Sequence, residues 1–514
     1  MGWHGKFDRL FIGGDWVQPS SLSQIEVISP ATEQPVAAVP SATARDVERA
    51  VAAARAAFDS GPWPRMSVSE RVDVLRRFAA LYAENEETIA GIVSEEMGCP
   101  ISLSRTFQAA TPRLILESYL ELAETYPFRS VRRSSTGSAL VTRESVGVVA
   151  AVVPWNVPQS VTMQKLAPAL ITGCTMVVKP SPETPLDAYL MAELLPRAGL
   201  PDGVVNVLPA DREVSELLVS HAGIDKVAFT GSTKAGRRIA AICGNDLRRV
   251  TLELGGKSAA IFLDDADLDS AVEKLRFASL RNSGQVCSLK TRLLVSERRE
   301  GELLDRLVAL VESMPVGDPS DPATQIGPMA SARHRQVVES YIDIGRSQGA
   351  RPVIGGGRPI GLDRGWYVEP TIFAGVKPGH RIAQEEIFGP VLSVLTFEDE
   401  DDAVAIANDS SYGLNGAVFT ADLYHGLSVA SRIRTGTVEL DGNPAGLFAP
   451  MGGFKSSGIG REQGHEGLDS YTEPRSIGLP PGLADLLETA LRSLTACHYA
   501  KPPQPRITHD IFYF

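Results

Sequence analysis

Four short apolar segments, each followed by a segment with helical periodicity, constrain the fold of this chain more than any other feature. The first, residues 146–153, is a nearly unbroken apolar run, which is typical of a strand buried on both faces of a parallel sheet. The others are residues 175–178, 204–208 and 226–229. Strands that alternate with helices in this way predict an α/β fold with a Rossmann-like, nucleotide-binding sheet.

Three residues follow or end these segments. Asn156 follows the first segment, Lys179 follows the second and Gly231 follows the fourth. Ligands of such sheets bind beyond the carboxyl ends of the parallel strands. We therefore expect these three residues to lie at the ligand-binding edge of the sheet.

A second series of apolar segments begins near Ser258 and predicts a second α/β domain. Gly255 and Gly256 precede this series and provide a hinge between the two domains. The strands of the second domain are expected at residues 291–296, 371–373, 391–397 and 416–420.

Two amphipathic helices are expected near the N-terminus, at residues 44–58 and 69–82. Thr43 is the expected N-cap of the first helix, and Ser67 or Ser69 that of the second.

The composition is that of a globular protein with two or three domains: 514 residues, 43% hydrophobic and 22% charged. A net charge of −12 argues against nucleic acid as a partner, because phosphate binding requires a basic surface. No apolar stretch is long enough to span a bilayer, and the N-terminus lacks the apolar core of a signal peptide. The five scattered cysteines lack the spacing of a disulfide framework or a zinc site, so we expect no metal and a reducing, cytoplasmic setting.

Cys287 ends the small, uncharged segment Asn-Ser-Gly-Gln-Val-Cys. A thiolate adds to a carbonyl carbon more readily than an alcohol does, and Gly284 allows a ligand to approach the backbone closely. The alternative is that Cys287 is a small buried hydrophobic residue, as most free cysteines are. Cys99, Cys174 and Cys243 are assigned to that class because their surroundings are apolar or helical.

Glu253 and Asn156 provide the other two groups that thioester chemistry requires. Apolar neighbours disfavour the charged form of Glu253 and so raise its pKa. A carboxylate in that state is a suitable general base for water. The structural alternative is that Glu253 forms a salt bridge with Lys257 or Arg249. Asn156 is either a turn residue after Pro154 or the amide donor of an oxyanion hole. Each donor of an oxyanion hole stabilises the transition state by roughly 3 kcal/mol.

The strings around these three residues resemble the NAD(P)-dependent aldehyde dehydrogenase superfamily, and the resemblance covers about residues 10–477. It implies the aldehyde dehydrogenase fold: a Rossmann-like cofactor domain, an α/β catalytic domain and a protruding β arm for oligomerisation. It also implies that Cys287 attacks an aldehyde, that Asn156 and the backbone N–H of Cys287 hold the oxyanion, and that Glu253 activates the water that cleaves the thioester. Hydride passes to the nicotinamide.

The segment at residues 229–236 joins a strand to a helix whose N-terminus can receive a pyrophosphate. Its spacing is not Gly-x-Gly-x-x-Gly, but it matches the family's own version. A P-loop is excluded, because Thr251 stands where glycine is required. The resemblance assigns Lys179 to the adenosine ribose and Glu386 and Phe388 to the nicotinamide ribose and ring. The expected NAD site comprises Val153, Trp155, Lys179, Ser181, Phe229, Gly231, Ser232, Gly236, Leu254, Glu386 and Phe388.

Other positions depart from the family pattern or leave alternatives. Pro182 stands three residues after Lys179, where NAD-preferring members often have Glu, so we expect NAD to be preferred over NADP by only about tenfold.

Lys165 relays protons in this family, or it is a solvent-facing helical lysine. A glycine-rich signature at residues 450–462 is interpreted as structural, and Asp441 replaces the usual Asn. Several aromatic residues of the aldehyde tunnel are replaced by Val157, Ser160, Val161, Gln164, Val286, Ser288 and Met451.

The resemblance also implies a division of the chain. We expect a cofactor domain at residues 1–124 and 144–255, a catalytic domain at 256–469, and an oligomerisation arm at 125–143 and 470–479. Unpaired strand edges in the arm require a partner, which predicts a homodimer or homotetramer. Residues 480–514 extend beyond the usual family end, with an amphipathic helix candidate at 483–494, and are a disordered tail or an added packing element.

The predicted function is oxidation of a small aldehyde to a carboxylic acid with NAD, or with NADP. A close alternative is a relative that transfers the acyl group to coenzyme A, but that branch typically lacks a base such as Glu253. A binding or structural protein on the same fold is disfavoured by the intact Cys287, Glu253 and Asn156.

Overall fold

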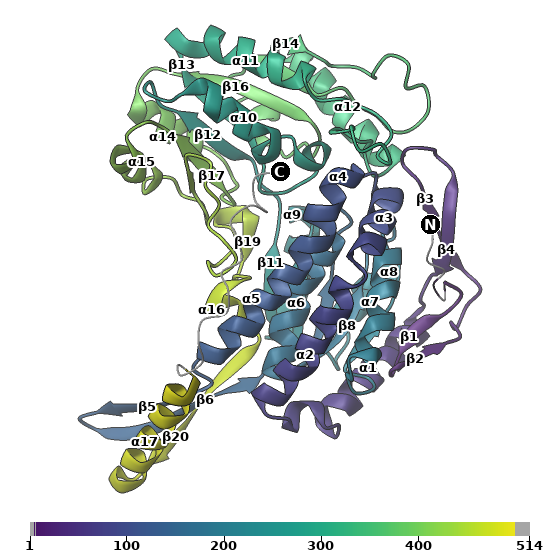
Figure 1. Cartoon of the computed structure of the whole chain (residues 1–514), viewed down its shortest axis with the longest axis vertical. Coiled ribbons are helices and arrows are strands. Elements are labelled where there is room, and N and C mark those ends of the chain that lie inside the picture. The colour runs from purple at the N-terminus through teal and green to yellow at the C-terminus, as the bar shows by residue number, and fades with distance from the viewer. Residues whose placement is uncertain (1–4, 6, 499–514) are drawn as a thin grey trace.

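The computed structural model describes residue 5 and residues 7–498, which form two large sheets covered by helices and a projecting arm (Figure 1). The first sheet has eight strands in the order β19-β11-β10-β7-β8-β9-β1-β2, and its five strands from β11 to β9 are parallel. All four strands predicted for this sheet are present. Its strands are β1 (Leu10–Ile12), β2 (Asp15–Val17), β7 (Val148–Val152), β8 (Thr175–Lys179), β9 (Val205–Val207), β10 (Lys226–Thr230), β11 (Arg249–Glu253) and β19 (Gly458–Ile459).

Strand β7 is apolar throughout because both of its faces are covered. Val148 and Ala150 pack in the cluster with α1 (Ala44–Asp59), α8 (Arg212–Ser220) and α9 (Thr233–Asn245). Val149 and Ala151 pack in the larger cluster on the other face. Most of that larger cluster comes from the helices α2 (Val68–Ala83), α3 (Glu86–Met97), α5 (Thr111–Thr125), α6 (Pro158–Thr172) and α7 (Leu186–Arg197).

The two helices predicted near the N-terminus are α1 and α2, and hydrogen bonds explain where they begin. Thr43 and Asp46 form a capping box at the start of α1. Ser67, rather than Ser69, caps α2 by accepting from the backbone N–H of Glu70, whose carboxylate accepts from the Ser67 N–H at 2.7 Å. Such caps contribute about 1 kcal/mol each.

The second sheet has seven strands in the order β14-β15-β16-β13-β12-β17-β18, and only β14 is antiparallel to its neighbour. The four strands predicted for it are present as β13, β15, β16 and β17. Helices α10 (Leu268–Ala278) and α11 (Glu300–Glu312) cover one face. The other face is covered by α12 (Ala332–Ser347), α13 (Arg381–Gln384), α14 (Glu400–Asn408) and α15 (Leu423–Ala430). The strands are β12 (Ser258–Phe262), β13 (Lys290–Ser296), β14 (Arg351–Ile354), β15 (Thr371–Ala374), β16 (Val391–Phe397), β17 (Gly416–Phe419) and β18 (Glu439–Leu440).

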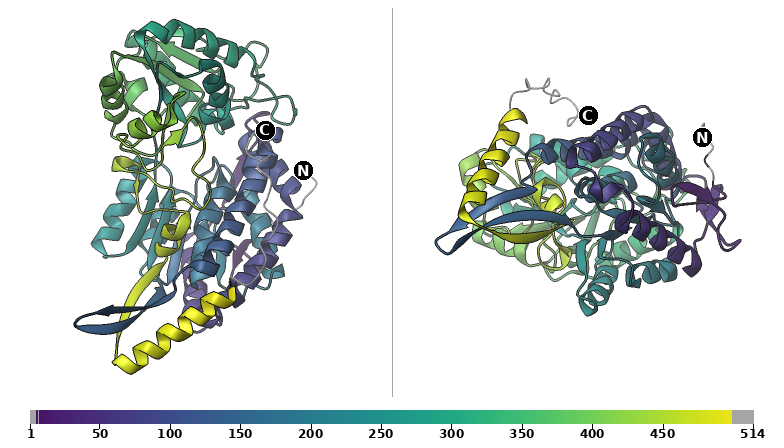
Figure 2. Two further views of the ribbon diagram at one scale, coloured as in Figure 1. Left: turned by 60° about the vertical axis from the view of Figure 1, so that its left-hand side comes forward. Right: turned by 90° about the horizontal axis from the view of Figure 1, so that it is seen from below.

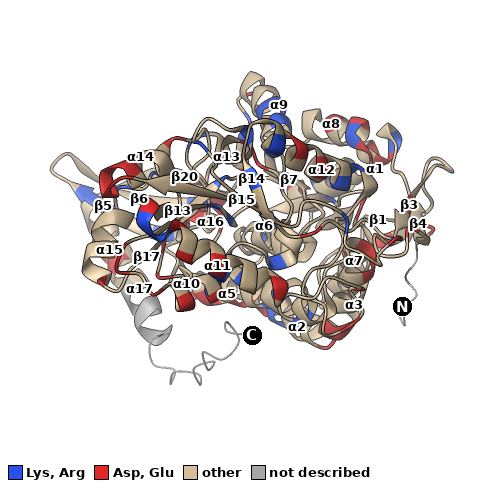
Figure 3. Cartoon of the chain, turned by 90° about the horizontal axis from the view of Figure 1, so that it is seen from above, with Lys and Arg blue, Asp and Glu red and all other residues tan. Residues whose placement is uncertain are grey.

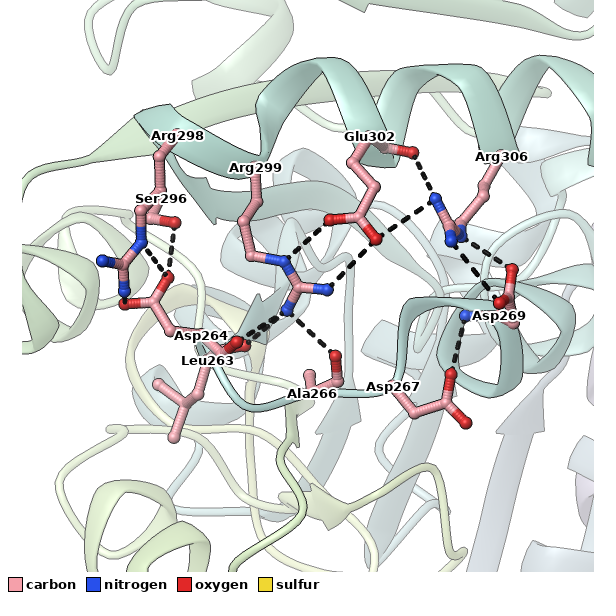
Figure 4. Close-up of polar contacts among 10 residues, drawn as sticks. All are labelled: Leu263, Asp264, Ala266, Asp267, Asp269, Ser296, Arg298, Arg299, Glu302 and Arg306. Atoms are coloured by element: carbon pink, nitrogen blue, oxygen red, sulfur yellow. Dashed lines mark hydrogen bonds and ion pairs between the residues drawn. The ribbon is translucent and has the colours of Figure 1, made fainter.

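An ion-pair network ties the start of α10 to α11 (Figure 4). Arg299 donates to the carbonyl oxygens of Asp264 and Ala266, at 2.9 Å each, and pairs with Glu302 at 3.0 Å. Glu302 also pairs with Arg306 at 3.3 Å. Because Arg299 is mostly buried and bonds to backbone oxygens, this network fixes α10 more firmly than an exposed ion pair would.

A three-stranded antiparallel arm projects from the first sheet, in the order β20-β6-β5 (Figure 2). Its strands are β5 (Arg129–Ser134), β6 (Gly137–Ser145) and β20 (Thr472–Leu479). Helix α17 (Pro481–His498) lies along the arm, where Arg133 pairs with Asp485 at 2.6 Å and with Glu488 at 3.0 Å. The expected helix of the extension is therefore an added packing element, while positions 499–514 lie outside the described residues. A separate hairpin is formed by β3 (Gln24–Ile28) and β4 (Pro35–Pro40).

One short strand does not follow the expected division. β19 lies within the range 256–469, yet it pairs with β11 at the edge of the first sheet. Gly458 makes this possible, because a Cβ at this position would collide with the carbonyl of Leu252. Apart from this strand, the domain boundaries remain a prediction.

Charged residues of both signs are mixed over the face in Figure 3. No helix within the described part of the chain is long and apolar enough to cross a membrane. Cys99, Cys174, Cys243 and Cys287 are all free thiols, and the first three are buried, as predicted.

Candidate active site

The carboxyl ends of four neighbouring strands bring the predicted site residues to one edge of the first sheet. Val152 at the end of β7 is in register with Lys179 of β8 and with Phe229 of β10. Thr230 of β10 is in register with Glu253 of β11. Asn156 follows β7 a few residues later. The edge predicted from the sequence is therefore present.

The loop that carries Cys287 has an unusual backbone. Asn282 and Ser283 both have φ of 56°, and Gly284 has φ of 78°. Left-handed non-glycine residues cost of order 1 kcal/mol or more each, so the surroundings must hold them. Gly284 is required for a second reason, since a Cβ there would collide with the carbonyl of Gly389.

Asn156 is bonded to this loop through both its backbone and its side chain. Its Nδ2 donates to the carbonyl oxygen of Gln285 at 2.9 Å. Its own carbonyl oxygen accepts from Nδ2 of Asn282 at 3.1 Å and from Nε2 of Gln108 at 2.9 Å. An amide has two donor hydrogens, and the described structure shows one of those on Asn156 in use.

Glu253 is 3% exposed, and both carboxylate oxygens are buried without a hydrogen-bond partner in the described structure. The salt-bridge alternative is wrong: Arg249 pairs with Glu473, and Nζ of Lys257 is buried without a hydrogen-bond partner. Burial raises the pKa of Glu253 well above 4.5, and the charge of Glu462 raises it further. A base with a raised pKa can take a proton near neutral pH.

Lys165 is fully buried on α6, so the solvent-facing alternative is wrong. Its Nζ pairs with Glu462 at 2.6 Å and donates to Oγ1 of Thr230 at 2.7 Å. The Lys165 cation lowers the pKa of Glu253, whereas burial raises it and has the larger effect. Three charged groups therefore interact around Glu253: Glu462 and the cations of Lys165 and Arg461.

Sequence reasoning missed Glu462 as a site residue, because it lies in the glycine-rich signature that was interpreted as structural. The available signal was an acidic residue next to several glycines, which allow other groups to lie close to the backbone. Gly452 in the same signature shows that closeness, since a Cβ there would press against a Glu253 carboxylate oxygen.

Cys287 is partly buried between these groups. Burial raises the pKa of its thiol to about 12, and the charges of Glu386 and Glu253 add to that effect. The thiol is therefore protonated at neutral pH in this arrangement and needs a base as it attacks. Glu253 lies within electrostatic reach of this thiol.

Of the predicted nicotinamide residues, Glu386 lies against the Gly255–Gly256 turn. Oε1 of Glu386 accepts from the backbone N–H of Gly256 at 3.0 Å, and a Cβ on Gly255 would collide with the same carboxylate. Burial raises the pKa of Glu386 to about 7. Phe388 packs edge-on against Trp155, with ring centres 5.4 Å apart.

The predicted adenosine residues lie on the neighbouring strand ends. Lys179 is 7% exposed, and burial lowers its pKa to about 8 while the charge of Glu183 raises it. The hydroxyl of Ser181 donates to the carboxylate of Glu183. Sequence reasoning missed Glu183. The available signal was its position directly after Pro182, next to the site where NAD-preferring members often have Glu.

The N-terminus of α9 also fits a pyrophosphate. Ser232 caps the helix, and its first backbone N–H groups lie at the end of β10. The glycines are close-packed: a Cβ on Gly236 would press against Leu254, and one on Gly231 against the ring of Phe229. Together with the buried, amide-bonded Glu386 carboxylate, these positions fit NAD. Within the described residues no group of three His, Cys, Asp or Glu side chains could hold a metal ion.

Comparisons with known proteins agree over nearly the whole chain. The model of the aldehyde dehydrogenase family matches residues 16–477. A geranial dehydrogenase from Castellaniella defragrans is 48% identical over 92% of this chain and 98% of its own length. A betaine aldehyde dehydrogenase from Rhizobium leguminosarum bv. trifolii is 41% identical over 91% of this chain and 96% of its own.

Solved structures of aldehyde dehydrogenases also match nearly the whole chain. An aldehyde dehydrogenase of Mycobacterium tuberculosis complexed with NAD+ superposes with a TM-score of 0.91 at 45% identity, covering 93% of this chain and 99% of that one. A Pseudomonas syringae aldehyde dehydrogenase C mutant, complexed with NAD+ and octanal, has a TM-score of 0.89 at 41% identity, covering 92% and 96%.

Proposed function

Because this chain belongs to the aldehyde dehydrogenase family and therefore oxidises an aldehyde to a carboxylic acid with NAD, we propose that Cys287, Glu253 and Asn156 carry out that reaction. The observation that supports this assignment most is the buried Glu253 carboxylate, which has no hydrogen-bond partner in the described structure and lies beside the loop of a protonated thiol. A structural carboxylate in such a position would be paired.

The first half of the reaction uses all three residues. Glu253 takes the proton of the Cys287 thiol as the sulfur bonds to the aldehyde carbon, which forms a thiohemiacetal. The second N–H of the Asn156 amide and the backbone N–H of Cys287 stabilise the resulting oxyanion. Bound NAD supplies the hydride acceptor, and loss of hydride leaves a thioester on Cys287.

The second half releases the acid. Glu253 first passes on the thiol proton, and its ionised carboxylate then takes a proton from water as the water oxygen bonds to the thioester carbon. The C–S bond breaks, and the acid that forms gives its proton to the departing Cys287 sulfur. The Lys165–Glu462 pair acts electrostatically on this carboxylate: the Lys165 cation lowers the pKa of Glu253 and the Glu462 charge raises it. We propose that Glu462 of the pair receives each proton from Glu253, because a Glu253 that keeps the thiol proton cannot activate water and one that keeps the water proton cannot act in the next turnover.

The test is an assay of NADH and acid production from a simple aldehyde, with and without coenzyme A. Hydrolysis predicts acid as the product at an unchanged rate when coenzyme A is added. Acyl-coenzyme A as the main product would contradict the role given to Glu253.

We also propose that the cofactor preference is set near Lys179. The carboxylate of Glu183, bonded to Ser181, repels a phosphate on the adenosine ribose, and Ser181 is not free to bind one. The expected result is a kcat/KM with NAD about tenfold above that with NADP. Glu183→Gln should narrow this ratio and Pro182→Glu should widen it. A wild-type enzyme that prefers NADP, or a ratio that neither variant changes, would place the determinant elsewhere.

The predicted assembly and location remain proposals. We propose a homodimer or homotetramer held through the arm of β5, β6 and β20, whose outer strand edges have no strand partner among the described residues. A monomer by light scattering at micromolar concentration would contradict it. The four free thiols favour a cytoplasmic location.

The names of the relatives do not point to one substrate. Geranial is an apolar aldehyde, betaine aldehyde is a cation, and a further relative, 40% identical, is a 3-succinoylsemialdehyde-pyridine dehydrogenase from a Pseudomonas species. Relatedness therefore leaves the choice of aldehyde to the residues that line this chain's own cavities.

A further inference from the structure

Lys257 is a buried lysine whose ammonium group lacks a partner. The residue is 2% exposed, and its Nζ forms neither a hydrogen bond nor an ion pair with any residue of the described structure. The next residue, Ser258, begins β12, and its hydroxyl is also buried without a partner. Buried donors of this kind are unfavourable unless an acceptor reaches them.

A second buried cation lies next to Lys257. Arg292 of β13 is 2% exposed, and its Nε donates to the carbonyl oxygen of Lys257 at 2.8 Å. Its two Nη atoms donate to the carbonyl oxygens of Ile406 at 2.8 Å and Ala407 at 2.7 Å, so all of these acceptors are neutral. Burial lowers the pKa of Lys257 to about 7, and the Arg292 cation lowers it further.

The carboxylates that act on Lys257 from farther away are bonded elsewhere. Glu386 accepts from the backbone N–H of Gly256 at 3.0 Å, and Glu385 is paired with Arg381 at 2.8 Å. Both raise the pKa of Lys257, but neither forms an ion pair with it in the part of the chain that the structure describes. Because a buried cation without a paired anion is destabilising, the two cations require a counter-ion that this chain does not supply.

Lys257, Ser258 and Arg292 line one small cavity. The cavity offers about 10 Å³ to the centre of a water-sized sphere, which is room for one small ion and too little for a phosphate or an organic acid. Its walls include the apolar side chains of Leu414 and Ile433, and no Asp or Glu is among the described residues that line it. Two cations, one hydroxyl donor and apolar walls suit a small anion of low charge.

We propose that this cavity binds one small monovalent anion, such as chloride, between Lys257 and Arg292. Nζ of Lys257 and the hydroxyl of Ser258 donate hydrogen bonds to the anion. Arg292 contributes mainly its charge, because its hydrogen bonds go to backbone oxygens. Charge-assisted hydrogen bonds are strong where water is excluded, and the anion keeps Lys257 in its protonated form.

The site lies directly behind the turn that holds Glu386. Gly256 of that turn precedes Lys257 and donates to Glu386. A Cβ on Gly256 would meet both the carbonyl oxygen of Cys287 and the side chain of Leu414, which lines the cavity. The anion would therefore lie one layer of residues away from the Cys287 loop, and its binding does not depend on the reaction proposed for that loop.

The direct test uses bromide, because its anomalous X-ray scattering identifies it in a crystal. Crystals of the full chain are soaked in about 200 mM sodium bromide, at a pH below the pKa of about 7 of Lys257, so that the lysine is charged. We expect an anomalous peak in the cavity, beside Nζ of Lys257. Crystals of Lys257→Met soaked in the same way should show no peak at this position.

Melting temperatures provide the test in solution. Sodium gluconate, whose anion is too large for the cavity, is the reference salt at the same ionic strength. The melting temperature in bromide, relative to that in gluconate, should be about 2 °C higher for the wild type than for Lys257→Met. Ser258→Ala, which removes one donor, should lie between them.

Lys226→Met is the matched control. Lys226 is also a fully buried lysine, at 1% exposure, but its Nζ donates to Oγ1 of Thr251 at 2.6 Å and lies 4.8 Å from the centre of the Tyr471 ring. Its loss removes a buried cation of the same kind away from the cavity. The difference between bromide and gluconate should therefore stay at the wild-type value.

Two results would overturn the proposal. One is a wild-type crystal without a bromide peak in the cavity, a result that depends on no variant. The other is a bromide effect on the melting temperature that Lys257→Met and Ser258→Ala retain in full. If Lys257→Met does not fold, the comparison with Ser258→Ala, which removes only a hydroxyl, decides the second point. Neither result bears on the role of Cys287.

Discussion

Replacement of Cys287 by alanine is expected to lower aldehyde oxidation by about 10⁴-fold or more, because no other group in the site can form the thioester. NAD binding should change little, since the predicted cofactor contacts come from strand ends and α9 rather than from the thiol. The measurements are steady-state NADH formation and a titration of NAD against the variant.

A suitable control is Cys174→Ala. Cys174 is fully buried and lies away from the strand ends, next to the backbone of Tyr471, so this change removes a thiol without touching the site. The control should retain most of its activity. Appreciable turnover by Cys287→Ala would refute the assignment of the nucleophile.

Replacement of Glu253 by glutamine is expected to leave a burst of about one NADH per site, slower than in the wild type because water must then accept the proton of the Cys287 thiol, and the burst is followed by a stall. Glutamine cannot take a proton from water, so the thioester accumulates after hydride transfer. Rapid-mixing absorbance measures the burst, and mass spectrometry of the intact chain should detect the acyl group on Cys287. Absence of both would mean that deprotonation of the thiol also depends strictly on Glu253.

The pH dependence gives the same residue a second test. Glu253 acts as a base only when it is ionised, and burial raises its pKa well above 4.5. Turnover of the wild type should therefore be present above that raised pKa and fall as the pH drops through it. Glu473→Gln, which removes an exposed carboxylate paired with Arg249, should keep this acidic limb. If the Glu253→Gln variant turned over at the wild-type rate, the role of Glu253 would be structural and not catalytic.

Much of the fold could be predicted because local patterns determine it. The strand expected at residues 391–397 is β16, and the caps at Thr43 and Ser67 begin their helices. The boundary at residues 146–153 was less accurate, since the strand begins only at Val148. Gly147 has φ of 125°, and a Cβ there would collide with Asp225, a constraint that an apolar run does not reveal.

The parts of the site that were missed depend on contacts between distant segments. Glu462 reaches Lys165 because β19 returns to the edge of the first sheet, and no local periodicity predicts that pairing. Burial also depends on tertiary packing. The helical pattern around Lys165 fits a solvent-facing side chain as well as it fits the fully buried one that α6 contains.

The return of β19 has a consequence for how the protein is made. Lys165 and Glu462 lie 297 positions apart, and β19 is synthesised after every other strand of the first sheet. Domains generally fold as the chain emerges, with N-terminal parts first. During synthesis Cys287 is therefore exposed before Glu462 and the glycine-rich segment can close around Glu253. The nascent chain therefore carries its predicted nucleophile before the charged groups around Glu253 are complete.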